Sequence, residues 1–255
     1  MLKQTNNLIH CITNPISIND CANLILALGA KPIMACHPDE VESITLNSSA
    51  LALNLGNFDD MRAKSMMISA KCAKGNKIPF ILDLVGVACS TLRLNYAKEL
   101  VSVACPTVIK GNISECKAFY GMTSHAHGVD ADIQDEEDIY ESCKWLKEMA
   151  LNLGCVVVCS GKIDVITDGK EVNLISNGCD MLSRITGTGC MLNVAIATFL
   201  ASYSPLLACI KATCYYEVAA EKTECSGPGT FHMHFMDEIY KLTSFDESLF
   251  KIEII

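Results

Sequence analysis

The segment 185–190, which reads ITGTGC, places a glycine-containing turn and a thiol directly before an apolar stretch. Small residues at the start of a helix leave backbone N–H groups unpaired, and these groups point toward an anion. The spacing matches neither a Walker loop nor a dinucleotide-binding GxGxxG motif. Glycines before a helix are also common in simple turns, so both interpretations stay open. Because a helix N-terminus lowers the pKa of a thiol, Cys190 is the best candidate for proton exchange among the fifteen cysteines.

A second set of candidates lies in the segments DLVG (83–86) and GNISE (111–115). Asp83 ends an apolar run, where a charged side chain is costly unless it has a role. Asn112 and Glu115 stand three residues apart at the start of a helical segment, which is the pattern of a capping box. The carboxylates of Asp83 and Glu115 also suit Mg²⁺ and its waters near transferring phosphates. The capping and metal-binding interpretations are compatible.

The remaining signals are weaker. The pair His125 and His127 lies in a polar loop, and His232 and His234 lie on a predicted helix, where positions i and i+2 do not share a face. No carboxylate cluster accompanies either pair, which favours solvated histidines over metal ligands. The chain also has no GxSxG motif, so an α/β-hydrolase is not indicated.

Short apolar runs alternate with helical segments along the chain. Runs at 31–36, 50–54, 79–87, 107–112 and 155–161 are predicted strands, because they are short and mostly apolar. Buried parallel strands joined by helices place binding loops at their carboxyl ends. The residues at these ends are Asn14, Asn54-Leu55-Gly56, Asp83, Lys110-Gly111-Asn112 and Ser160-Gly161.

Helices complete the predicted fold. Ser17 is a predicted cap for a helix that stops near Gly29, an acidic helical turn begins at Pro38, and a helix of roughly 15 residues follows residue 54. A further helix is predicted over 136–151, and the last 65 residues read as three helices. Asp168-Gly169 joins two alternating runs, which predicts a hairpin. Without repeats or linkers, residues 1–255 form a single α/β domain by this interpretation.

The composition limits the function further. Of the 255 residues, 50% are hydrophobic and 19% are charged, so the chain can bury a large core and is not globally disordered. The net charge is −9 and no basic stripe is present, which argues against a nucleic-acid partner. The odd and high number of cysteines, without any CxxC pair, indicates reduced and mostly buried thiols.

Neither a signal peptide nor a membrane segment is predicted. The amino terminus has no clean apolar core, and the uncharged stretch 185–210 is interrupted by Asn193, several hydroxyl groups and Pro205. A buried core helix explains this stretch better than a membrane span. The expected location is the cytoplasm, with no membrane partner.

Seven motifs in order carry a resemblance over roughly residues 8–235. They resemble the hydroxyethylthiazole kinase family, which belongs to the ribokinase-like superfamily. The motifs are HCITN (10–14), AN followed by LALGAKPIMA (22–35), LDLVG (82–86), KGNISE (110–115), SGKIDVITDG (160–169), ITGTGC (185–190) and GPGTF (227–231).

The resemblance implies a function and a site. It implies a ribokinase-like fold, with a mostly parallel sheet and helices on both faces, that phosphorylates the primary alcohol of 4-methyl-5-(2-hydroxyethyl)thiazole. The resemblance also implies ATP as the co-substrate and Mg²⁺ as the cofactor. It implies a place in thiamine biosynthesis or salvage, and a homotrimer with shared active sites. By motif position, the implied residues are Asn14, Met34 and Gly187 for the thiazole, Cys190 as the catalytic cysteine, Asp83 and Glu115 for the metal, and Lys110, Ser160, Thr186 and Gly189 for ATP.

Three positions depart from the family pattern. Lys110 replaces a common arginine, Leu84 replaces a usual proline, and Asn57 replaces a frequent threonine. A lysine presents a point charge to a phosphate where an arginine presents a two-pronged fork. The loop after Asp83 is also expected to be less rigid without the proline. We therefore expect a functional kinase with somewhat weaker nucleotide binding.

Two other functions remain as alternatives. One is a superfamily kinase acting on a hydroxymethylpyrimidine or pyridoxal-like ring, and the segments HCITN and PIMA argue against it because the resemblance assigns them to a thiazole pocket. The other is a catalytically silent nucleotide-binding protein, against which Asp83, Glu115 and TGTGC speak.

Overall fold

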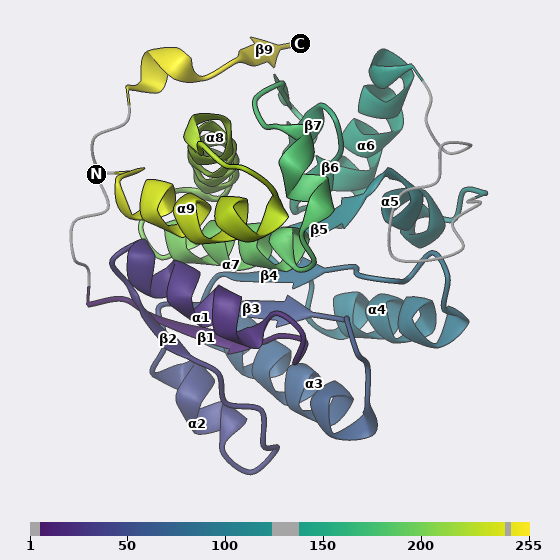
Figure 1. Cartoon of the computed structure of the whole chain (residues 1–255). Helices are drawn as coiled ribbons and strands as arrows, with labels where there is room; N and C mark the ends of the chain where they lie inside the picture. The colour runs from purple at the N-terminus through teal and green to yellow at the C-terminus, as the bar shows by residue number, and fades with distance from the viewer. Residues whose placement is uncertain (1–5, 124–137, 243–245) are drawn as a thin grey trace.

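A nine-stranded sheet runs through the centre of the molecule (Figure 1). The computed structural model describes residues 6–123, 138–242 and 246–255. The strand order is β2-β1-β3-β4-β5-β6-β7-β8-β9, in which β2 to β6 are parallel and the last three pairings are antiparallel. The strands are β1 (Leu8–Ile12), β2 (Lys31–Ile33), β3 (Ala50–Asn54), β4 (Phe80–Asp83), β5 (Val108–Asn112), β6 (Val156–Ser160), β7 (Asp164–Thr167), β8 (Val172–Ile175) and β9 (Ile252–Ile254).

Helices cover both faces of the sheet. Figure 1 shows α1, α7, α8 and α9 on one side and α2 to α6 on the other. The helices are α1 (Ile18–Ala27), α2 (Val41–Leu46), α3 (Asp60–Gly75), α4 (Thr91–Val103), α5 (Ile113–Tyr120), α6 (Ile139–Leu153), α7 (Thr188–Leu200), α8 (Pro205–Lys222) and α9 (Pro228–Tyr240), with short 3-10 helices at Asp180–Arg184 and Glu247–Leu249. The α/β, ribokinase-like arrangement expected from the sequence is confirmed.

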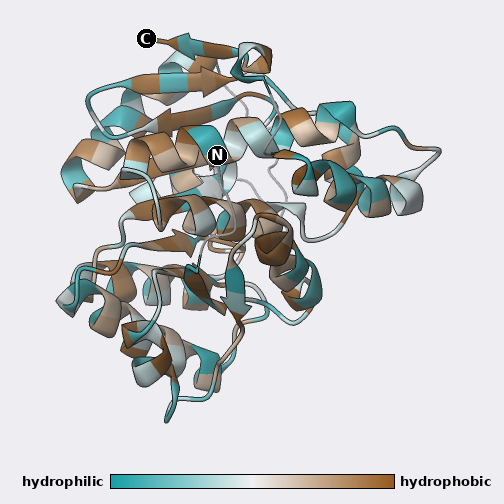
Figure 2. Cartoon of the chain, turned by 90° about the vertical axis from the view of Figure 1, so that its left-hand side faces the viewer, coloured by the Kyte–Doolittle hydropathy of each residue, from teal (hydrophilic) through white to brown (hydrophobic). Residues whose placement is uncertain are grey.

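Alternating side chains divide the core into two layers. On β3, Ala50 and Ala52 pack into the cluster that contains α1, α7 and α8, whereas Leu51 and Leu53 pack into the cluster on the opposite face. This alternation follows from the two-residue repeat of a strand. Figure 2 shows hydrophobic residues along the strands and hydrophilic residues on the outer turns of the helices. The small alanines leave room for α7 to lie close to the centre of the sheet.

Helix α7 is buried on all sides. Every residue from Cys190 to Leu200 is buried, which is typical of a helix enclosed in a protein core. The uncharged stretch that contains it is broken after Leu200, and α8 starts separately at Pro205. The expectation of a core helix is confirmed. Among the described residues, no helix has both the length and the apolar character needed to cross a membrane.

Several predicted boundaries need correction. The predicted strand 79–87 ends at Asp83, because residues 84–87 turn and Val87 N–H donates to Leu84 O at 3.0 Å. The predicted strand 31–36 ends at Ile33, because as an edge strand it pairs with only three residues of β1. The helix expected from Pro38 begins at Val41, after a turn.

Other predictions agree more closely. Strand β3 covers 50–54 as expected, and β7 and β8 form the predicted hairpin, with Gly169 at φ 87° in its turn. The helix expected over 136–151 is α6, whose described part begins at Ile139. All fifteen cysteines are free, and ten of them are buried, as expected for thiols used as small core residues.

Candidate active site

Polar side chains gather where the parallel strands end and α7 begins. Asn14 follows β1, Asp83 ends β4, and Lys110 lies on β5, while Cys190 lies in the first turn of α7. All four are buried. Asn14 Nδ2 donates to Cys190 Sγ at 3.0 Å, and Lys110 Nζ donates to Asp83 Oδ2 at 3.2 Å. Residues far apart in the sequence thus meet at the carboxyl edge of the sheet, as expected for this class of fold.

Asn54, at the end of β3, connects these groups. Its Nδ2 lies 3.2 Å from Asp83 Oδ2 and 3.3 Å from Cys190 Sγ. The sequence drew attention to Asn54 only as one of the residues at strand ends and assigned it no role. The signal that identifies it is an amide at the end of a fully buried strand, where an unsatisfied polar group would be costly.

The electrostatics of Cys190 differ from the sequence-based expectation. Burial and the nearby charge of Asp83 raise the pKa of the Cys190 thiol, although hydrogen bonds from Ser17 and Asn14 and the charge of Lys110 act to lower it. The prediction that the helix N-terminus yields a lowered pKa is therefore wrong, because desolvation outweighs the favourable groups.

Asp83 and Lys110 form a buried ion pair. Burial acts to lower the pKa of Lys110, but the charges of Asp83 and Glu115 outweigh it and raise that pKa above its usual value. The second carboxylate oxygen, Asp83 Oδ1, is buried and has no hydrogen-bond partner among the described residues. A buried carboxylate oxygen without a donor is an available ligand for a cation.

Glu115 forms the predicted capping box with Asn112. Asn112 N–H donates to Glu115 Oε2, and Glu115 N–H donates to Asn112 Oδ1, both at 2.9 Å. The other carboxylate oxygen accepts the Gly86 N–H at 2.8 Å. Burial, and then the charge of Asp83, raises the pKa of Glu115 to about 7. The capping box holds Glu115 beside Asn112, and the Gly86 hydrogen bond ties it to the loop that follows Asp83.

The donor set of Asp83 and Glu115 fits Mg²⁺. Hard carboxylate oxygens suit this ion, which usually takes one or two protein carboxylates and completes its shell with water and substrate phosphates. The described residues contain no group of three or more His, Cys, Asp or Glu side chains that could hold a metal alone. A two-carboxylate site shared with phosphates matches that observation.

The start of α7 has the features of an anion site. Its first position follows Gly187, which has φ 94°, and no side chain among the described residues caps the helix. A Cβ at Gly187 would lie 2.9 Å from Ser17 Cβ, so α1 and α7 meet too closely for a larger residue. Lys110 Nζ lies 3.6 Å from the position that a Cβ on Gly189 would occupy. Gly189 and Thr186 are both exposed. Unpaired helix donors and a buried cation therefore lie next to each other at the start of α7.

The other two predicted residues flank this cluster. Met34 follows β2 and is half-buried against the core on the α1 and α7 side. Ser160 ends β6, where its hydroxyl donates to Gly111 O at 3.4 Å. The strand order places Met34 and Ser160 at opposite ends of the row of strand termini.

Two further residues shape the site in ways that sequence reasoning missed. Ser17 stands at the N-cap position of α1, but the prediction that it caps the helix is wrong for its side chain, because the hydroxyl donates to Asn14 Oδ1 at 3.3 Å and bonds to no N–H group of α1. Arg62 of α3 is buried and donates to the carbonyl oxygens of Asn54, Gly56 and Asn57 at 2.5–3.0 Å. A serine before a helix and an arginine inside one carry no sequence signal for these contacts.

The departures from the family pattern have local structural consequences. Leu84 N–H donates to Lys110 O at 2.8 Å, a bond that a proline could not form. This bond ties the loop after Asp83 to β5. Asn57 adopts φ 47°, a left-handed conformation that asparagine tolerates better than most residues.

The described histidine pair does not form a metal site. His232 Nε2 lies 3.2 Å from Asp20 Oδ1, whereas His234 Nδ1 lies 2.7 Å from Glu224 O, so the two rings have different partners. The pair His125 and His127 lies outside the described residues.

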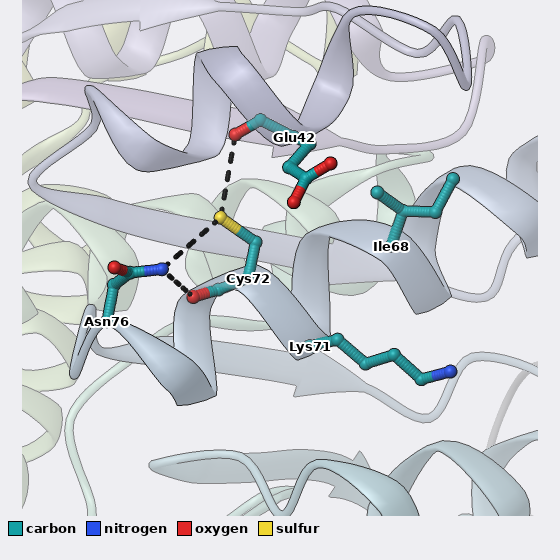
Figure 3. Close-up of a pocket in the computed structure, with 5 residues that line it drawn as sticks. All are labelled: Glu42, Ile68, Lys71, Cys72 and Asn76. Carbon is teal, nitrogen blue, oxygen red and sulfur yellow. Dashed lines mark hydrogen bonds between the residues drawn. The ribbon is translucent and has the colours of Figure 1, made fainter.

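A separate groove lies between α2 and α3 (Figure 3). Its volume is about 390 Å³, and it is lined by Glu42, Ile68, Lys71, Cys72 and Asn76. Cys72 Sγ donates to Glu42 O at 3.5 Å, and Asn76 Nδ2 donates to Cys72 O at 2.8 Å. None of the predicted site residues lines this groove.

The sheet order and the helices on both faces define a fold of the ribokinase-like class. The pyridoxal kinase of Staphylococcus aureus, in complex with AMP-PCP and pyridoxal, matches 98% of this chain and 99% of its own length, with a TM-score of 0.67 and 14% identity. At this identity the match supports the fold alone.

The family follows from closer matches. The model of the hydroxyethylthiazole kinase family matches residues 1–245. Hydroxyethylthiazole kinase 2 of Clostridium botulinum (strain Hall) is 48% identical over 246 residues, which cover 95% of this chain and 93% of the relative. A solved hydroxyethylthiazole kinase protein from Pyrococcus horikoshii OT3 matches all of this chain and 96% of its own, with a TM-score of 0.89 and 30% identity. The chain belongs to the hydroxyethylthiazole kinase family and is a phosphotransferase.

Proposed function

We propose that this protein transfers the γ-phosphoryl group of ATP to the primary alcohol of 4-methyl-5-(2-hydroxyethyl)thiazole, within thiamine biosynthesis or salvage. The observation that carries the proposal is the position of Cys190. Its thiol lies at the uncapped start of α7, 3.0 Å from Asn14 Nδ2 and beside the Asp83–Lys110 ion pair. This arrangement supports a reaction in which the acceptor alcohol, the phosphates and the metal meet beside Cys190.

The thiazole occupies the flank formed by the ends of β1 and β2. Asn14 supplies a polar contact, and Met34 supplies a polarizable apolar surface for a small ring. Gly187 lies against the hydroxyethyl arm in this proposal, at the point where α1 and α7 approach so closely that a Cβ would meet Ser17 Cβ at 2.9 Å. This places the alcohol beside the first turn of α7.

ATP occupies the opposite flank. Lys110 neutralises phosphate charge, Ser160 contacts the nucleotide at the end of β6, and the backbone N–H groups of Thr186 and Gly189 donate to phosphate oxygens. Phosphoryl transfer depends chiefly on alignment and charge neutralisation, which a helix N-terminus and a buried lysine provide.

Asp83 and Glu115 hold Mg²⁺ in this proposal. When bound, the ion neutralises charge on the transferring phosphates and orients them. Asp83 offers a carboxylate oxygen without another partner, and the capping box keeps Glu115 in place. The two residues therefore present fixed carboxyl oxygens at the nucleotide side, and Mg²⁺ would bind them in their ionised forms.

Cys190 accepts the alcohol proton as the new O–P bond forms and the bond to ADP breaks. Only the thiolate can act in this way, and the raised pKa of Cys190 keeps its population small at neutral pH. The thiol is therefore a modest base, and the α7 backbone donors and Lys110 supply the larger share of the stabilisation.

The decisive experiment is a coupled ADP-release assay with Mg-ATP. It compares hydroxyethylthiazole, hydroxymethylpyrimidine and no acceptor. We expect ADP release only with the thiazole. Release with the pyrimidine alone would overturn the acceptor assignment, and silence with all three despite an ATP-induced rise in melting temperature would indicate a nucleotide-binding protein without kinase activity.

A further inference from the structure

The Asn54 side chain has every hydrogen-bonding position occupied. Its Oδ1 accepts the Gly56 N–H at 2.8 Å and Asn14 Nδ2 at 3.3 Å. Its Nδ2, which carries two hydrogens, donates to Asp83 Oδ2 and Cys190 Sγ. The residue is fully buried. Two donors and two acceptors on four partners leave the amide no free capacity.

These contacts fix the orientation of the amide. Gly56 N–H is a donor only, so it must face the oxygen and not the nitrogen of the Asn54 side chain. The two N–H groups then necessarily face Asp83 and Cys190. The backbone is fixed as well, because Arg62 Nη2 donates to Asn54 O at 3.0 Å.

We propose that Asn54 is a positioning residue for phosphoryl transfer, which holds the Cys190 thiol and the Asp83 carboxylate at a set separation through one amide group. This inference rests on the proposed function, in which Cys190 faces the acceptor alcohol and Asp83 faces the metal and phosphates. Asn54 touches neither substrate and acts through these two residues. The rate of phosphoryl transfer depends on how these two groups are placed relative to each other, because a small misplacement of reacting groups lowers the rate strongly.

Loss of this link affects turnover more than binding. Asn14 keeps its position without Asn54, because its Oδ1 accepts Ile16 N–H, Ser17 N–H and the Ser17 hydroxyl at 3.1–3.3 Å. The thiazole contact from Asn14 is therefore retained. The nucleotide contact from Ser160 lies on another strand. We expect the loss to fall on kcat and not on the two KM values.

The test uses two variants and a matched control. Asn54→Asp keeps the size of the side chain, but its carboxyl group has at most one O–H where the amide has two N–H donors. Asn54→Ala removes the link entirely. Asn193→Ala is the control, since Asn193 is another fully buried amide, one turn along α7, that donates to Leu53 O at 3.3 Å. It lowers stability without touching Cys190 or Asp83.

We expect both Asn54 variants to lose about 10- to 100-fold in kcat, with each KM within about threefold of the wild type. Asn193→Ala should keep kcat within about twofold despite a lower melting temperature. Wild-type kcat in Asn54→Asp overturns the inference, and so does an equal loss of kcat in Asn193→Ala.

A second measurement separates this inference from the proposed function. The rate of Cys190 alkylation by iodoacetamide at one fixed pH, followed on the Cys190 peptide by mass spectrometry, requires no turnover. The thiolate is the reacting form, so removal of an N–H donor should slow alkylation at least about threefold in Asn54→Asp. If the wild type phosphorylates none of the alcohols, slowed alkylation still supports the Asn54 link, and an unchanged rate overturns it.

Discussion

Lys110 contacts Asp83 with a single ammonium group, which in the proposed function also meets the phosphates of ATP. A guanidinium at this position would offer parallel donors to a phosphate while keeping the contact with Asp83. We predict that Lys110→Arg lowers the KM for ATP about three- to tenfold, measured in the coupled assay. Lys170→Arg, in the exposed β7–β8 turn, is the control. An unchanged or raised KM for ATP in Lys110→Arg contradicts the prediction.

In the proposed reaction, Cys190 acts as a base only through its thiolate, which its raised pKa keeps a minor form. We predict that Cys190→Ala lowers kcat about 100-fold, near the lower end of what a general base supplies. Cys190→Asp should retain more activity, because a carboxylate is ionised at neutral pH. The matched control is Cys209→Ala, which removes a fully buried thiol from α8 without touching the site. Equal kcat values for Cys190→Ala and Cys209→Ala would exclude a role for the thiol in turnover.

At the scale of elements, α8 and β7 are joined by two buried carboxyl groups. Glu217 of α8 and Asp164 of β7 are both buried, and burial followed by the charge of Asp164 raises the pKa of Glu217. Folding therefore retains a proton that the unfolded chain releases above its ordinary pKa, so this contribution to stability is present at low pH and declines as pH rises.

Replacing the carboxyl group at position 217 with an amide would remove this dependence of stability on pH. Glu217→Gln keeps a donor toward Asp164 without binding a proton. We predict a gain of at least about 1 kcal/mol at pH 8.5, equivalent to about 2–4 °C in melting temperature, and a smaller gain at pH 5.5. Glu224→Gln, which changes an exposed carboxylate, should show no such trend. A gain from Glu217→Gln that is the same at both pH values would contradict the shared-proton explanation.

The connection from β3 to α3 depends on one buried arginine. Arg62→Ala leaves the carbonyl oxygens of Asn54, Gly56 and Asn57 without their donor. We predict a loss of about 3 kcal/mol in unfolding free energy, measured by thermal unfolding, because each lost bond to a charged donor costs about 1.5–3 kcal/mol and the loop relaxes in part. Lys64→Ala, an exposed change on the same helix, should change stability by less than about 0.5 kcal/mol.

The sequence predicted elements whose local pattern matches their final environment. Strand β3 is a short apolar run that is buried on both faces, and the β7–β8 hairpin carries its own turn signal at Asp168-Gly169, so both were predictable. Strand β9 was missed, since a three-residue exposed strand exists only through its pairing with β8. Helix α4 was also missed, because its apolar pattern is weak and its packing against the sheet stabilises it.

The residues of the candidate site also divide into those that local sequence could predict and those that it could not. Asp83, Glu115 and Cys190 carry signals in their residue types and neighbours, and their assignment rested also on the family resemblance. Asn54 and Ser17 act through hydrogen bonds between segments distant in the chain, such as Asn54 to Cys190, which no local pattern encodes. The pKa of Cys190 was mispredicted for a related reason, since burial by surrounding elements is not visible in the sequence around it.

At the scale of the whole molecule, we predict a homotrimer. The family resemblance implies that a neighbouring subunit completes each thiazole pocket, so activity should depend on assembly. Light scattering after size exclusion should give the mass of three 27.7 kDa chains. Specific activity should fall on dilution to concentrations at which the particle dissociates. A monomer with full specific activity would contradict this prediction.

The strand order has a consequence for how the substrate preference of such a protein can be changed by mutation. In the proposed function, the acceptor binds at the ends of β1 and β2 and the nucleotide binds at the ends of β5 and β6, and these strands come from different stretches of chain. Substitutions near Asn14 and Met34 can therefore redesign the acceptor pocket while Lys110 and Ser160 stay untouched. A new alcohol preference is accessible by mutating one flank, and directed evolution confined to residues 14–37 would keep an intact phosphoryl donor site.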